Sequence, residues 1–335
     1  MKQQENEETQ YQYFLQGIVA QVGSLTPENT YVQVRKIRKN NGCSAEGLEI
    51  RDSRSGLSPT VYLMPYFREY KEGADIRELA GKIYAAYGEK RTRLDLAPGF
   101  FSSYSNLSGS VAYKIVNYKA NRDVLEEIPH QRILDLAVVY YCLIDSEEYF
   151  TSFVIRNQNL TNWGIPQEKL FREAAVNAPK LLPPKISPLR RVLLDMMREQ
   201  TDVAEDDTTD EKYKGDLYQK DGEVQTAWDA GGPEIYVLTN ETKVQGAACI
   251  FYENVLQDFA DKTGSDLIII PSSVHEVLLL PTRSFTGYSS GKCSADVRRE
   301  LDEMVRSVNE KEVSPDEVLS DHVYFYEREK GRLTM

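Results

Sequence analysis

The chain of 335 residues has few of the residues on which many specialised proteins depend. Only three histidines and four cysteines occur, and no two cysteines form a CxxC pair, which argues against a structural zinc site. The longest apolar run, residues 133–144, is shorter than the ~20 residues that span a bilayer, and Asp135 interrupts it. The opening residues, MKQQENEETQ, lack the basic and apolar parts of a secretory signal. We therefore expect a cytoplasmic protein with reduced cysteines, no bound metal and no contact with a membrane.

Positive charge is also scarce, because 40 Lys and Arg stand against 52 Asp and Glu, which gives a net charge of −12. A nucleic-acid binder needs a Lys or Arg for each phosphate that it contacts. The one dense basic run, Arg35, Lys36, Arg38 and Lys39, falls in an expected strand, where alternate side chains point to opposite faces. Such charge protects an edge strand from aggregation without any ligand. We therefore expect no nucleic-acid partner.

Sequence motifs for nucleotide and metal binding are absent as well. Neither GxGxxG nor GxxxxGK[ST] occurs, and the turn that contains Gly291 and Lys292 lacks the glycine spacing of a phosphate loop. His275 and Glu276 begin an HExxH-like pattern, but Leu279 stands where the second histidine is required. The sequence therefore predicts no cofactor.

Apolar spacing predicts helices and strands along most of the chain. Expected helices cover residues 13–22, 76–87, 166–175, 189–197, 252–260 and 297–308. Expected strands cover residues 31–37, 48–51, 60–64, 111–118, 134–143, 150–156, 235–239, 247–251, 267–270, 277–280 and 323–326. The order Ser314, Pro315, Asp316, Glu317 has the spacing of a helix start, with an N-cap, a first-turn proline and a capping-box glutamate.

These elements predict an α+β fold with mixed, largely antiparallel sheets and packed amphipathic helices. Residues 134–178 and 235–261 share the order strand, strand, helix. They are either two related strand-strand-helix units or a coincidence of a common order, and the sequence leaves both open.

An acidic stretch separates two better-patterned regions. Residues 1–198 form an expected N-terminal α+β region, and residues 225–335 a C-terminal α+β region that stands apart or packs with the first as one body. Between them, residues 199–224 lack apolar periodicity and are rich in Asp, Glu and Thr. We expect this stretch to be a mobile linker or loop, and residues 201–222 of it to be dispensable for folding, since ordering them would cost entropy without burial. A specific acidic interaction segment is the alternative.

The most concentrated polar group is the sequence PSSVHEV, between the apolar strands LIII and VLLL. A hydroxyl from Ser272 or Ser273, the imidazole of His275 and the carboxylate of Glu276 are the parts of an acyl-transfer or proton-transfer site. The alternative is a structural turn that the serines cap, with His275 bonded to a backbone carbonyl. The nucleophile motif GxSxG is absent.

Other polar residues are weaker candidates. Asn159 and Asn240 stand at strand ends as candidate polar supports for such a site. We interpret His130 and His322 as structural histidines rather than ligands.

Several ordered stretches carry a resemblance to a known family. They are RKNNGCSAEGLEI, PTVYLMPYFREYKEG, EIPHQRILDLAVVYYCLI, TNWGIPQEKLFREAA, YVLTNETKVQGAACIFYENVL, LIIIPSSVHEVLLLP and VNEKEVSPDEVLSDHVYFYER. In these stretches the chain resembles the bacterial domain of unknown function family 5688, over nearly its whole length. The resemblance implies one shared architecture in a bacterial cytoplasmic protein, and it implies no activity, cofactor or catalytic residue.

Two functions of different classes remain, and whether the protein is an enzyme stays open. The first is a binding or regulatory module that acts through protein contacts, favoured by the absence of a catalytic signature and by 21 tyrosines, which suit interfaces as well as cores. The second is a hydrolase with His275 as general base, Ser272 or Ser273 as nucleophile, and Glu276 to orient the imidazole. The two differ in geometry, because the hydrolase needs a free imidazole nitrogen beside a serine hydroxyl.

Overall fold

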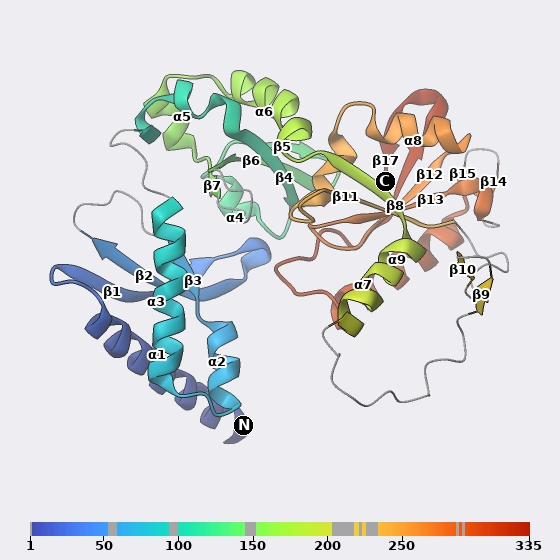
Figure 1. The fold of residues 1–335 in the computed structure, drawn as a ribbon. Helices are drawn as coiled ribbons and strands as arrows, with labels where there is room; N and C mark the ends of the chain where they lie inside the picture. Colours follow the sequence, from blue (N-terminus) through green and yellow to red (C-terminus); the bar gives the residue numbers. More distant parts are fainter. Residues whose placement is uncertain are drawn as a thin grey trace. The chain divides into compact units, whose positions relative to one another are not determined.

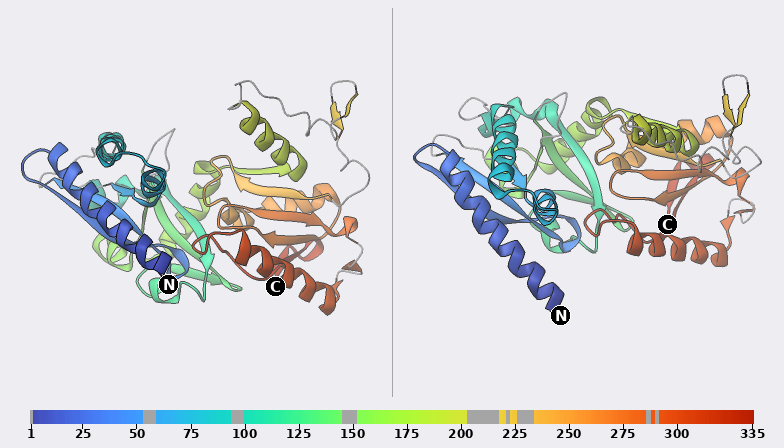
Figure 2. Two further views of the ribbon diagram at one scale, coloured as in Figure 1. Left: turned by 90° about the horizontal axis from the view of Figure 1, so that it is seen from below. Right: turned by 60° about the horizontal axis from the view of Figure 1, so that its bottom comes forward.

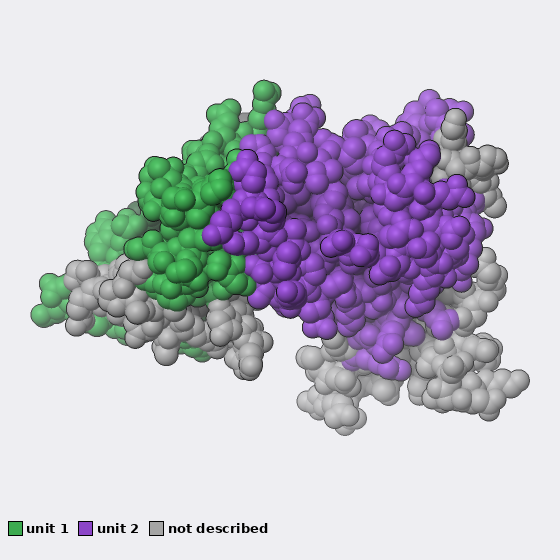
Figure 3. Space-filling view, turned by 90° about the horizontal axis from the view of Figure 1, so that it is seen from above, with its two compact units in different colours: residues 1–111, 120–128, 141–167 green, residues 112–119, 129–140, 168–335 purple. Residues whose placement is uncertain are grey.

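The structure is a computed structural model that describes residues 2–52, 59–93, 100–144, 152–202, 218–220, 223–225, 234–285, 288–289 and 292–335 (Figure 1). The chain divides into two compact units, coloured separately in Figure 3. Unit 1 comprises residues 1–111, 120–128 and 141–167, and unit 2 comprises residues 112–119, 129–140 and 168–335.

Unit 1 is built around a three-stranded antiparallel sheet in the order β1-β2-β3. The strands are β1 (Thr30–Arg38), β2 (Ser44–Asp52) and β3 (Thr60–Tyr62), and the helices are α1 (Lys2–Leu25), α2 (Met64–Lys71) and α3 (Ile76–Arg93). Phe14, Ile18 and Val22 recur every four residues along α1, so they form one buried stripe against Leu48 and Ile50 of β2. The three helices and the sheet therefore share one core.

The middle of the chain forms a second sheet, in the order β4-β6-β5 with β7 paired to β6. Its strands are β4 (Val111–Asn117), β5 (His130–Ile133), β6 (Leu136–Leu143) and β7 (Ser152–Val154), and the helices of this region are α4 (Arg122–Leu125), α5 (Asn157–Trp163) and α6 (Gln167–Leu181). Short 3-10 turns, η2 (Phe100–Ser102), η3 (Tyr104–Asn106) and η4 (Ser108–Ser110), precede β4. Seven of the eight residues of β6 are buried, which accounts for the longest apolar run of the sequence.

Unit 2 contains a six-stranded sheet in the order β17-β16-β12-β13-β11-β8, with every neighbouring pair antiparallel. Its strands are β8 (Pro184–Pro188), β11 (Tyr236–Asn240), β12 (Leu267–Pro271), β13 (Val277–Pro281), β16 (Tyr324–Glu327) and β17 (Arg332–Thr334). The helices are α7 (Leu189–Asp202), α8 (Val255–Thr263) and α9 (Ala295–Lys311). Helix α8 lies on one face of the sheet, and α7 and α9 lie on the other (Figures 1 and 2).

Helix α9 is held on the sheet by an apolar contact. Val305 is buried against Ile268 of β12 and Leu280 of β13, and Leu301 packs beside it. Helix α7, in contrast, continues directly from β8. The N–H of Leu189 donates to the carbonyl of Ile235 at 2.9 Å. The residue at which the chain leaves the sheet for α7 therefore lies beside the residue at which the chain re-enters the sheet.

The predicted α+β fold with largely antiparallel sheets is confirmed. The second of the two suggested strand-strand-helix units is wrong, because residues 247–251 lie in the 3-10 helix η7 (Gly246–Phe251) and not in a strand. Five consecutive residues of this run are buried, and a short, wholly apolar run gives no period that separates a strand from a helix.

The predicted helix start at Ser314 is also wrong. Residues 314–317 form a single turn, closed by the N–H of Glu317 and the carbonyl of Ser314 at 2.8 Å. The chain cannot continue as a helix here, because the carbonyl of Glu317 accepts from the N–H of Val274 at 2.9 Å.

The compact units do not follow the predicted division at 199–224. Residues 168–198 belong to unit 2, because β8 pairs with β11 in the same sheet. Within the acidic stretch, residues 199–202 end α7, and β9 (Tyr218–Lys220) pairs with β10 (Glu223–Gln225) as a short hairpin. Its residues 203–217 and 221–222 lie outside the described part of the chain.

The remaining short elements are η1 (Asn40–Gly42), η8 (Thr282–Ser284), β14 (Tyr288–Ser289), β15 (Lys292–Cys293) and η9 (Arg328–Lys330). None of the helices in the described ranges has the length and apolar character needed to cross a membrane.

Candidate functional site

The predicted polar turn joins β12 to β13 in unit 2, and its serines hold the turn together. The Oγ atom of Ser273 accepts from the backbone N–H of His275 at 3.0 Å, and the N–H of Ser273 donates to the carbonyl of Glu276 at 3.2 Å. The hydroxyl of Ser272 donates to Oε1 of Glu276 at 3.5 Å. The structure thus brings the four predicted residues together in one turn, in which both serines bond to groups of the turn itself.

The ring of His275 is engaged at both nitrogens. Its Nδ1 accepts from the backbone N–H of Gln245 at 3.2 Å, and its Nε2 lies 3.5 Å from Oε1 of Glu317. Because Nδ1 uses its lone pair as an acceptor, the neutral ring carries its proton on Nε2. A general base needs a free lone pair, and this ring offers none to Ser272 or Ser273.

The two asparagines proposed as supports each stabilise their own turn. Asn240 is 1% exposed; its Nδ2 donates to the carbonyl of Val244 at 2.8 Å. Asn159 lies in unit 1 and accepts from the backbone N–H of Arg156 at 2.7 Å, at the start of α5. Among the described residues, neither side chain hydrogen-bonds to the turn that contains His275.

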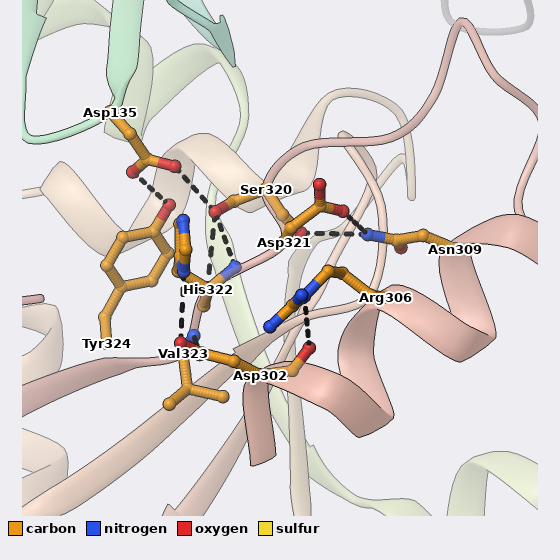
Figure 4. A network of polar contacts seen from close by, with 9 residues as sticks. All are labelled: Asp135, Asp302, Arg306, Asn309, Ser320, Asp321, His322, Val323 and Tyr324. Atoms are coloured by element: carbon orange, nitrogen blue, oxygen red, sulfur yellow. Dashed lines mark hydrogen bonds and ion pairs between the residues drawn. The ribbon is translucent and has the colours of Figure 1, made fainter. Parts of the chain in front are cut away.

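A second polar cluster of unit 2 was not predicted from the sequence, and it is centred on His322 (Figure 4). The Nδ1 of His322 lies 3.1 Å from Oδ2 of Asp302, whose side chain is 13% exposed. The other oxygen of Asp302 accepts from the backbone N–H of Val323 at 2.8 Å. Because a carboxylate only accepts, Nδ1 is the protonated nitrogen, and the lone pair of the neutral ring is on Nε2. Within the described part of the chain, no group hydrogen-bonds to this Nε2.

Asp135 forms the other end of this cluster. Its two oxygens accept from the hydroxyls of Tyr324 and Ser320, both at 2.7 Å. Tyr324 is 0% exposed and Ser320 is 1% exposed. Burial and the neighbouring Asp135 charge raise the pKa of Tyr324 far above its ordinary value, so its hydroxyl stays a donor. The preceding residue, Leu134, has a positive φ of 57°, a costly conformation for leucine in the turn that presents Asp135.

Parts of this cluster do have a signal in the sequence. Ser320, His322 and Tyr324 alternate, so in an extended chain they point to one side. Asp302, Arg306 and Asn309 follow at helical spacing on α9; Nε of Arg306 donates to the carbonyl of Asp302, and Nδ2 of Asn309 to that of Ser320. The signal for Asp135 is its position as the one charge inside the most apolar run.

Thiols and metal ligands offer no further site among the described residues. Burial raises the pKa of Cys142 and of Cys249 to about 12, so both are protonated thiols in apolar surroundings. No group of three or more His, Cys, Asp or Glu in the described ranges could hold a metal ion. His130 lies in β5 beside the ring of Tyr118, with ring centres 6.1 Å apart.

The last feature is apolar rather than polar. Helix α7 carries Leu189, Val192, Leu193, Met196 and Met197 at the spacing of a single stripe, and none of the five is buried. The exposed fraction is 43% for Leu193, 49% for Met196 and 55% for Met197. We call these five residues the α7 stripe.

The fold defines an α+β protein of two compact units, one of which carries a histidine–carboxylate cluster and an exposed apolar helix face. The chain belongs to a family of unknown function, DUF5688, whose model matches residues 11–328. The resemblance seen in the sequence is thereby confirmed. No curated protein and no solved structure matches the chain.

Proposed function

We propose that this protein acts by binding another protein, and that the α7 stripe is the contact surface. The observation that carries the proposal is the exposure of the stripe. An amphipathic helix normally buries its apolar side against a core, whereas Leu193, Met196 and Met197 are each more than two-fifths exposed. Contiguous apolar surface of this kind is typical of interaction sites.

The partner that fits this surface is an amphipathic helix with an apolar side of its own. Charge does not select this partner, because α7 carries three arginines, Arg190, Arg191 and Arg198, against three acids, Asp195, Glu199 and Asp202. The flexible thioethers of Met196 and Met197 suit a surface that adapts to the side chains of a docking helix.

The proposed setting is a bacterial cytoplasm. It is supported by the family resemblance and by the buried thiols of Cys142 and Cys249. The overall negative charge favours a protein partner over a nucleic acid.

Site-specific crosslinking in the native host tests the proposal. A photoreactive amino acid placed at Leu193 should crosslink to a protein that the same amino acid at Val176 does not reach. Val176 is a matched control, because it is 57% exposed on α6 and lies outside the stripe. With the purified partner, Leu193→Glu together with Met197→Glu should weaken binding at least about tenfold, since each buried apolar anchor contributes 1 kcal/mol or more. The variant Val176→Glu should bind as the parent does.

Two results would contradict the proposal. One is a crosslinking pattern at Leu193 that equals the pattern at Val176, and the other is a partner whose affinity survives both glutamates. A crosslink only to a second copy of the chain would also overturn it, because the stripe would then serve self-association.

A further inference from the structure

Two histidines of unit 2, His275 and His322, are held in opposite ways. His275 accepts at Nδ1 from Gln245, so the proton of its neutral ring is on Nε2, beside Glu317. His322 donates from Nδ1 to Asp302, so the lone pair of its neutral ring is on Nε2. The sequence pattern selected His275 as the candidate general base. In the structure, it is His322 whose neutral ring has its lone pair on Nε2 with no described hydrogen-bond partner.

We propose that His322 is an acyl-accepting nucleophile, with Asp302 as its positioning residue. Three features carry this inference. The carboxylate of Asp302 is nearly buried and is itself fixed by the N–H of Val323, so it holds one tautomer of the ring. The side chain of His322 is 45% exposed, so the ring is not closed off from solvent. No described group competes for the Nε2 lone pair.

The substrate class is a small, neutral, activated ester. The same cluster contains the carboxylates of Asp135 and Asp321 in addition to Asp302, against the single guanidinium of Arg306 (Figure 4). This excess of negative charge disfavours an anionic phosphoryl donor and does not oppose a neutral acyl donor.

The reaction has two substitution steps at the acyl carbon. The Nε2 lone pair bonds to the carbonyl carbon, and the ester C–O bond breaks, so the alcohol leaves as its anion with the bonding electrons. Asp302 stabilises the positive charge that the acylated ring acquires, through the Nδ1 proton. Water then adds to the acyl carbon and gives one proton to the departed alcohol anion, and the C–Nε2 bond breaks with its electrons returning to the ring, which releases the carboxylic acid and the alcohol and restores the free ring.

Labelling of the full-length protein with diethyl pyrocarbonate, a neutral acylating reagent, tests the reactivity directly. Peptide mass mapping should find His322 acylated about fivefold or more faster than His275, which must give up a hydrogen bond to react. Nitrogen-15 NMR at neutral pH should show the Nδ1–H tautomer for His322 and the Nε2–H tautomer for His275. Both measurements use the parent chain and need no variant to fold.

Two variants separate the positioning role from a merely structural one. In Asp302→Asn, the amide oxygen keeps the N–H of Val323 while the amide nitrogen donates to Nδ1, which moves the ring proton to Nε2. Its His322 should then be acylated about fivefold or more slowly, with the His275 rate unchanged. Hydrolysis of p-nitrophenyl acetate should fall to the buffer rate in His322→Gln and persist in His275→Gln. An Nε2–H tautomer at His322 in the parent, or equal acylation of the two histidines, would overturn the proposal.

Discussion

Asp135 offers the sharpest test of how unit 2 is held together, because it connects the turn between β5 and β6 to β16. Replacing it by alanine removes the acceptor of two short hydrogen bonds, from Tyr324 and from Ser320. Both donors are almost fully buried, so water cannot take the place of the carboxylate. The variant should therefore unfold more easily than the parent.

The size of the loss follows from these contacts. A buried donor left without its acceptor costs about 1–3 kcal/mol, and a bond to a charged group lies toward the upper end of that range. Ser320 recovers part of the loss, because its hydroxyl lies 3.4 Å from the carbonyl of His322 and can donate there. We expect Asp135→Ala to lower the free energy of unfolding by about 2–4 kcal/mol, or the Tm of unit 2 by about 5–12 °C.

Differential scanning calorimetry measures this shift, and a double-mutant cycle assigns it. Tyr324→Phe should by itself cost about 1–2 kcal/mol, and its cost in the Asp135→Ala background should be smaller by about 1 kcal/mol, because the shared bond is already lost. Glu310→Ala, at an exposed position of α9, is the control and should stay within about 0.5 kcal/mol of the parent. Strictly additive effects, or an Asp135→Ala variant as stable as the control, would show that these two bonds do not stabilise unit 2.

Two further changes test other parts of the fold. Gly246→Ala should lower the free energy of unfolding, measured in urea, by more than about 2 kcal/mol. The added Cβ would lie 2.6 Å from the carbonyl oxygen of His275 and 2.7 Å from a backbone nitrogen. Unchanged stability would mean that the neighbouring backbone moves away from the Cβ without cost. Burial raises the pKa of Glu49 in unit 1, but the hydrogen bonds from Gln33 and Arg51 outweigh it, so the net shift is downward from 4.5. The stability that Glu49 contributes is therefore complete above its unfolded pKa and is lost as the pH falls through its lower folded-state pKa. The variant Glu49→Gln should lose less stability than the parent between about pH 5 and pH 3. An equal dependence of stability on pH in the two proteins would contradict the downward pKa shift.

Helices and strands with a clear hydrophobic period were predictable from the sequence. The wrong predictions concern segments whose secondary structure is determined by tertiary contacts. The stripe of α1 and the buried strand β12 carry their own periods or composition, so local pattern was sufficient. The sequence that begins at Ser314 has the complete pattern of a helix start. The carbonyl of Glu317, however, accepts a hydrogen bond from the N–H of Val274, which is distant in the sequence. No local pattern contains that contact.

The chemistry of the candidate sites likewise depends on residues that lie far from each motif in the sequence. The turn around His275 was located from its polar residues, but its chemistry depends on Gln245 and Glu317, which lie outside the motif. The residues next to His322 in the sequence do not mark it as reactive. Its tautomer is fixed by Asp302 on α9. Residue types can be found in a sequence, whereas the assignment of a ring proton needs the partners that the fold supplies.

The junction of β8 and β11 has a consequence for how this protein can vary. These strands are hydrogen-bonded neighbours, with Pro188 opposite Tyr236, so residues 189–235 form an excursion whose two ends lie about one strand spacing apart. Closing a loop costs entropy that grows only with the logarithm of its length, so lengthening or replacing this excursion changes little for the sheet. Helix α7 can therefore diverge in sequence, and with it the proposed contact surface, while the six strands and the cluster around His322 stay as they are.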